Sequence, residues 1–132
     1  MKMSEKVKTV IAKSVVAYVA SADEEGRPHL AVSRLIRVLD DQHVAFTAWF
    51  CPRTAENVSR NPAVSVAVWD SVADHGYQIV GRVSDSSIVA VVDGWSGDER
   101  SASAAPQEER KLTVKVEQIM EFKTGVHTDD PV

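Results

Sequence analysis

Six short apolar segments recur along the chain, and each is bounded by residues that favour turns. They span residues 15–22, 28–39, 43–50, 63–70, 76–84 and 111–122. Many of their residues are β-branched, and several segments alternate apolar with polar residues, which is typical of strands. Closing such strands into a barrel removes open edges that would otherwise pair with other chains. We therefore predict a mainly β fold with short helices, built as a small six-stranded antiparallel barrel.

Three further segments favour short helices. Residues 4–13 place apolar side chains at helical spacing behind Ser4, a suitable N-cap. Residues 52–60 begin at a proline, which suits the first helical position, and end before Asn61-Pro62. Residues 87–95 contain the run IVAVV, which fits a strand or a helix. For this last segment we predict a short helix.

Length and composition indicate one domain. The chain has 132 residues, of which 44% are hydrophobic, and this is enough to bury a core without disulfides. We expect an opening helix at about 4–13, a barrel at about 14–123 and a loose tail at 124–132.

Charge and cysteine content exclude several classes of function. The formal charge is −4, and lysine and arginine are scattered rather than clustered with aromatic residues, which argues against nucleic-acid binding. The sequence contains no apolar run long enough for a membrane span, and charges interrupt the place of a signal peptide. Cys51 is the single cysteine and fits a reducing compartment. We expect a cytoplasmic protein whose partners are small molecules or proteins.

Arg53 follows the proline that begins the predicted helix at residues 52–60. A helix start leaves backbone N–H groups unpaired and carries the positive end of the helix dipole, so it favours an anion. Arg53 and Thr54 would add a guanidinium and a hydroxyl, which together suit a phosphate. In the alternative interpretation Arg53 pairs with Glu56 on its own helix or stays solvated.

The order of these segments resembles a known family. Phe46-Thr47 ends a strand, Cys51-Pro52-Arg53 precedes a helix, and Asn61-Pro62 precedes the next strand. This succession resembles the FMN-binding split β-barrel proteins related to pyridoxamine 5'-phosphate oxidase, over roughly residues 15–83. The resemblance implies a six-stranded antiparallel split β-barrel that binds FMN, in a homodimer with flavin in the cleft between subunits.

The resemblance also implies roles for individual residues. Arg53, Thr54 and Thr47 would hold the phosphate, and Arg34 or its neighbour Ser33 would contact the phosphate or the ring. The remaining candidates lie beside these positions in the sequence: Phe46 and Ala48 flank Thr47, Trp49 lines the cleft, and Cys51 stands where the family has a hydroxyl. Trp49 is preferred over Trp69, for which core packing is the default, and over Trp95.

Departures from the family pattern leave the reaction open. Cys51 and Pro52 replace a hydroxyl and a basic residue, and no substrate motif of the oxidase occurs near the C-terminus. Cys51 beside Arg53 could also be a redox thiol, although a small residue replacing serine is the simpler interpretation. We predict no catalytic side chain and no metal site.

Three functions remain open. The first is an FMN-dependent oxidoreductase or electron carrier of unknown substrate. The second is a non-catalytic protein for flavin binding, storage or sensing. The third is a reductase that uses a deazaflavin coenzyme. The redox partner, whether small molecule or protein, is not identified by the sequence.

Overall fold

The computed structural model describes residues 2–49, 52–92 and 107–132, which form two helices and seven strands. The helices are α1 (Glu5–Lys13) and α2 (Pro52–Arg60). The strands are β1 (Ala17–Ala22), β2 (Pro28–Ser33), β3 (Ile36–Asp40), β4 (His43–Trp49), β5 (Ala63–Asp70), β6 (His75–Val92) and β7 (Gln107–Glu121). None of the described helices is long and apolar enough to cross a membrane.

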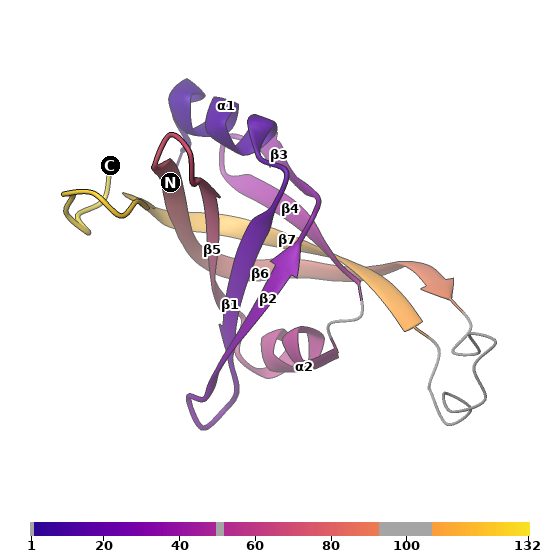
Figure 1. Cartoon of the computed structure of the whole chain (residues 1–132). Coiled ribbons are helices and arrows are strands. Elements are labelled where there is room, and N and C mark those ends of the chain that lie inside the picture. The colour runs from indigo at the N-terminus through magenta and orange to yellow at the C-terminus, as the bar shows by residue number, and fades with distance from the viewer. Residues whose placement is uncertain (1, 50–51, 93–106) are drawn as a thin grey trace.

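The seven strands form one antiparallel sheet in the order β2-β1-β5-β6-β7-β4-β3. Two local hairpins, β1–β2 and β3–β4, lie at opposite ends of this order. The sheet curls until β2 and β4 touch, and the long β6–β7 pair runs across the molecule (Figure 1). The predicted antiparallel split-barrel architecture is confirmed.

The two helices occupy opposite ends of the curled sheet, with α1 at the top and α2 at the bottom of Figure 1. In α1, the Ser4 hydroxyl accepts a hydrogen bond from the Val7 N–H at 3.3 Å, which caps the helix. Val7 and Ile11 point into the core and are almost fully buried. At the other end, the buried Asn57 of α2 donates to the Ser21 hydroxyl of β1 at 3.0 Å. The helices predicted at residues 4–13 and 52–60 are therefore confirmed.

The core lies inside the curl and consists mostly of valine and isoleucine. Fully buried members include Val44 on β4, Val66 on β5, Ile79 on β6 and Leu112 on β7. Burying such side chains is worth about 1.5–3 kcal/mol each relative to exposure. These contacts hold the sheet around the core and fix the strand order.

The segment at residues 28–39, predicted as one strand, is two strands in the structure. The chain bends after Ser33, so β2 ends there and β3 begins at Ile36. The count is therefore seven strands rather than six. No glycine or proline marks the bend, and apolar residues stand on both sides of it, which is why the sequence reads as one strand.

The prediction of a helix at residues 87–95 is wrong for residues 87–92, the part that the structure describes. Residues 87–92 belong to β6 and pair with residues 107–111 of β7. Their β-branched side chains suit a strand, and the neighbouring strand supplies hydrogen bonds that a sequence window cannot show. Residues 93–95 lie outside the described part.

The predicted loose tail at 124–132 is exposed along its length but is attached at two places. Asp74 accepts hydrogen bonds from residues 124 and 125. The Val132 N–H donates to the Ile119 carbonyl at 2.8 Å. Ile119 lies on the part of β7 that does not pair with β4.

Gly81 lies on β6, where β7 leaves no room for a side chain. A Cβ atom at this position would collide with the carbonyl oxygen of Lys115 and the side chain of Val114. The register between β6 and β7 also shifts beside Gly81. Only glycine therefore fits here without moving the β7 backbone.

We expect Gly81→Ala to lower the free energy of unfolding by about 1–3 kcal/mol, because the added methyl group overpacks the β6–β7 contact. Urea denaturation measures the change. Ser86→Ala on the exposed face of β6 is the control and should change stability by less than about 0.5 kcal/mol. Equal stability of the two variants would contradict the proposed close packing.

Candidate functional site

The two ends of the sheet order meet at Ser33, Leu35 and Thr47. The Ser33 hydroxyl lies 2.7 Å from the Thr47 carbonyl oxygen and 3.0 Å from that of Leu35. The Thr47 N–H donates to the Leu35 carbonyl at 3.3 Å. Because Ser33 is only 4% exposed, these bonds form inside the protein and join the end of β2 to β4.

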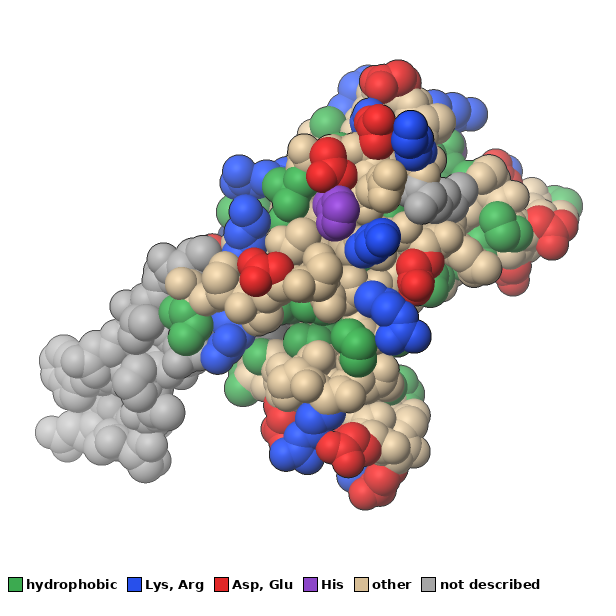
Figure 2. Space-filling view, turned by 180° about the vertical axis from the view of Figure 1, so that it is seen from behind, with side chains coloured by type: hydrophobic (Ala, Val, Ile, Leu, Met, Phe, Trp, Pro, Cys, Tyr) green, Lys and Arg blue, Asp and Glu red, His purple; other side chains and the backbone are tan. Residues whose placement is uncertain are grey.

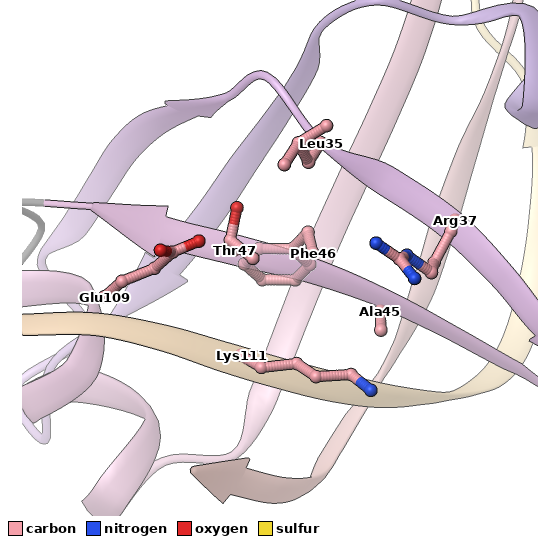
Figure 3. Close-up of a pocket in the computed structure, with 7 residues that line it drawn as sticks. All are labelled: Leu35, Arg37, Ala45, Phe46, Thr47, Glu109 and Lys111. Carbon is pink, nitrogen blue, oxygen red and sulfur yellow. The ribbon is translucent and has the colours of Figure 1, made fainter. Parts of the chain in front are cut away.

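A hollow of about 240 Å³ opens beside this junction, and we call it the Thr47 hollow. It is lined by Leu35, Arg37, Ala45, Phe46, Thr47, Glu109 and Lys111. Figure 3 shows Arg37 and Lys111 at one end, on either side of Ala45, and Glu109 at the other end, near Thr47. The hollow therefore combines an apolar wall with two cations.

Strand register explains why these residues share one face. Arg37 pairs with Ala45 across β3–β4, and Thr47 pairs with Lys111 across β4–β7. Alternate residues of neighbouring strands point to the same side of a sheet, so the two cations and the threonine converge. Neither Arg37 nor Lys111 forms an ion pair with another described residue. Both are therefore available to an anion.

Arg53 and Thr54, the predicted phosphate residues, stand in the first turn of α2. Arg53 is exposed and has no ion pair with a described residue, so it does not pair with Glu56. Thr54 is fully buried, and its Oγ1 atom has no hydrogen-bond partner among the described residues. Neither residue lines the Thr47 hollow.

The other predicted residues divide into two groups. Thr47 and Phe46 line the hollow, although Phe46 is only 2% exposed and belongs to the core. The Ser33 hydroxyl is already bonded to the backbone, and Arg34 lies exposed in the bend between β2 and β3. Cys51 and the side chains of Ala48 and Trp49 lie outside the described part of the structure.

The sequence analysis missed Arg37 and Lys111. They lie on different strands, far apart in the chain, and the pairing of β4 with β7 brings them to one face. The available signal was that each is a charged residue within a strand, at an outward position of the alternation. Without the register, that signal cannot identify a common site.

A second hollow of about 440 Å³ lies over β1, β2, β5 and β6, and we call it the Trp69 hollow. Its walls include Tyr18, Leu30, Trp69 and Phe122. The rings of Trp69 and Phe122 pack edge to face, with 6.4 Å between their centroids. Gln78 donates to the Ser65 hydroxyl at 2.7 Å, which leaves the amide oxygen of Gln78 for another partner. This hollow suits a flat apolar group.

An exposed apolar strip borders the Trp69 hollow. Leu30 is 67% exposed and Val32 is 56% exposed, both on β2. By contrast, the view from behind in Figure 2 shows positive and negative side chains interspersed between small hydrophobic groups. The outward side of β2 therefore differs from a typical solvated surface.

Comparisons with known proteins agree with this architecture. Residues 3–122 match the family model described as pyridoxamine 5'-phosphate oxidase. No curated protein matches the sequence significantly. The crystal structure of HupZ from Group A Streptococcus is similar at 20% identity, covering 96% of this chain and 98% of that chain, with a TM-score of 0.67.

Two further solved structures are similar in fold. An FMN-binding protein from Syntrophomonas wolfei is 14% identical, with 94% of this chain and 87% of that chain covered and a TM-score of 0.63. A protein called F420 reductase is 15% identical, with 89% of this chain and 98% of that chain covered and a TM-score of 0.61. At such identities the likeness is one of fold.

We expect Ser33→Ala to lower the free energy of unfolding by about 1–3 kcal/mol, because the Thr47 carbonyl loses the hydroxyl that donates to it, while the Leu35 carbonyl keeps the Thr47 N–H. The midpoint of urea denaturation, at unchanged slope, measures the loss. Ser84→Ala is a matched control, since its hydroxyl makes an exposed 3.4 Å contact with the Thr113 carbonyl. A Ser33 variant as stable as the control would show that the bond does not hold the junction.

Proposed function

Because the chain belongs to the pyridoxamine 5'-phosphate oxidase family, we propose that it binds FMN at the Thr47 hollow. The observation that carries this proposal is the hollow itself, where an apolar wall meets two cations that have no ion pair with a described residue, at the junction of the sheet. The apolar wall suits the flat ring of a flavin, and the two cations suit the negative charge that the ring takes up on reduction. The likeness in fold to an FMN-binding protein supports the choice of ligand.

The residues present fit FMN in one orientation. The phosphate would lie at the start of α2, where Arg53 and the unpaired N–H groups of the first turn favour an anion. The unbonded Oγ1 of Thr54 lies beneath the same turn and would gain a partner after a small adjustment. Thr47 would contact the ribityl chain, and the ring would extend towards Leu35.

Arg37 and Lys111 would then stand near the ring, at the end of the hollow away from Glu109. Bound FMN supplies hydride or single-electron transfer. Positive charges beside the ring stabilise an anionic reduced state, so these two side chains would raise the tendency of the flavin to accept electrons. We propose an FMN-dependent oxidoreductase or electron carrier on this basis.

A second copy of the chain would complete the site. At about 240 Å³, the Thr47 hollow is smaller than the roughly 300–1,000 Å³ typical of small-molecule sites. The Trp69 hollow of a partner offers the missing apolar cover, with the Gln78 amide for the polar edge of the ring. The exposed Leu30 and Val32 would be buried between the copies. We therefore propose a homodimer with flavin in the cleft.

A deazaflavin coenzyme is the second candidate ligand, favoured by the likeness in fold to F420 reductase. A non-catalytic flavin-binding protein is the third reading of the same hollow. Steady consumption of NAD(P)H with an electron acceptor, dependent on added FMN, would support an enzyme. Retained FMN without turnover would support a binding protein.

We expect Arg53→Ala to weaken FMN binding by about 10- to 100-fold while changing riboflavin binding little, because riboflavin lacks the phosphate. Arg37→Ala and Lys111→Ala should instead weaken the binding of FMN and of riboflavin by similar factors, each smaller than the loss of FMN binding in Arg53→Ala. Quenching of flavin fluorescence during titration measures the affinity of the wild type and of each variant for the two ligands.

Lys115→Ala is the control, since Lys115 is an exposed cation on β7 that does not line the hollow. Loss of the preference for FMN in Arg37→Ala but not in Arg53→Ala would place the phosphate at the opposite end. Unchanged affinity in all three variants would exclude the Thr47 hollow as the flavin site.

We expect Leu30→Asp to convert the dimer into a monomer, because a charge would replace an apolar side chain at the interface. Light scattering coupled to gel filtration measures the mass. Val72→Asp is the control: Val72 is 95% exposed in the β5–β6 turn, so its substitution should leave the dimer intact. A Leu30 variant that remains dimeric would place the interface elsewhere.

A further inference from the structure

The carboxylate of Asp74, in the turn between β5 and β6, binds both the end of β5 and the start of the C-terminal tail. Its Oδ1 atom accepts from the Trp69 indole N–H at 3.1 Å and from the Thr124 N–H at 2.8 Å. Its Oδ2 atom accepts from the Thr124 hydroxyl and the Gly125 N–H, each at 2.9 Å. We call this arrangement the Asp74 clasp.

The backbone of Asp74 is held in an unusual conformation. Its φ is +49°, in the left-handed region that glycine adopts freely and that aspartate and asparagine adopt more often than most other residues. The hydrogen bonds, above all the one from the Thr124 backbone, lower the pKa of Asp74 to about 2. The carboxylate is therefore ionised at neutral pH, and its four hydrogen bonds offset the backbone strain.

The clasp holds two walls of the Trp69 hollow. Trp69 lines the hollow directly, and its indole is fixed by the bond to Asp74. Lys123 and Thr124 form another part of the wall, where the tail leaves β7. Asp74 itself is not among the lining residues, so it acts on the hollow through the residues that it holds.

The tail is also fixed at its far end. The Val132 N–H donates to the carbonyl of Ile119 on β7 at 2.8 Å. The segment between these attachments is exposed, and Figure 1 shows it beyond the end of β7. The clasp is thus the attachment nearest to the hollow.

We propose that Asp74 is a positioning residue of the flavin cleft, holding Trp69 and the start of the C-terminal tail as walls of the Trp69 hollow. The link to flavin rests on the function proposed above. Opening the clasp frees the indole and the tail together, and this widens the hollow and weakens its hold on a flat ring. The proposal gives the tail a role in ligand binding.

Limited proteolysis tests the clasp without any ligand. Trypsin cleaves after Lys123, and mass spectrometry detects release of residues 124–132. Asp74→Gly tolerates the positive φ but removes the carboxylate, so we expect release at least about 10-fold faster than in the wild type. Asp74→Asn keeps the conformation and one acceptor oxygen, so it should give an intermediate rate. Equal rates in the wild type and Asp74→Gly would overturn the clasp.

Asp70→Asn is the matched control in the same turn. It removes one charge but retains the Oδ1 atom that accepts from the Val72 and Ala73 N–H groups. Its rate of release should equal that of the wild type. Faster release in this variant would show that loosening the turn, rather than the clasp, frees the tail.

Titration with FMN tests the link to the cleft. We expect the dissociation constant to rise by about 3- to 10-fold in Asp74→Gly, with a smaller rise in Asp74→Asn, and tryptophan quenching at saturation to change in the same order. Faster release of the tail with an unchanged dissociation constant would overturn the positioning role. Failure of the wild type to bind FMN would overturn the proposed function, while proteolysis would still decide the clasp.

Discussion

The closure of the sheet between Ser33, Leu35 and Thr47 is the contact on which the rest of the structure depends. The strand order places β2 and β3 at opposite ends, although they are consecutive in the chain. A buried hydroxyl satisfies the carbonyl groups where the two ends meet, which allows polar backbone inside the protein. The curl encloses the valine-rich core on one side and presents the Thr47 hollow on the other. Fold and site therefore share one junction.

Local signals in the sequence were sufficient for most elements. Ser4 marks the start of α1, Pro52 marks the start of α2, and β-branched runs mark the strands. The bend after Ser33 escaped prediction because its reason is a contact with Thr47, which is distant in sequence. Residues 87–92 were mistaken for helix because their strand character depends on pairing with β7. Both failures have the same cause, since a sequence window contains no information about its neighbour in space.

The residues of the candidate site were likewise only partly predictable from local sequence. Thr47 was identified through a resemblance carried by short motifs, and it does line a hollow. Arg37 and Lys111 were not identified, since they come together only through the registers of β3 with β4 and of β4 with β7. The Ser33 hydroxyl bonds the backbone at the junction, and its expected contact with a ligand stays a prediction. Short motifs thus pointed to Thr47 on one side of the hollow, and strand pairing brings Arg37 and Lys111 to it.

The strand order also has a consequence for synthesis of the protein. β4 pairs with β3 and β7, and β7 is the last strand of the chain. On the ribosome, which adds roughly 5–20 residues per second, the β3–β4 hairpin therefore has an unpaired edge until residues 109–115 have emerged. Such an edge is a template for pairing with other chains. The nascent protein thus passes through a stage open to aggregation, and that stage ends only when β7 completes the sheet.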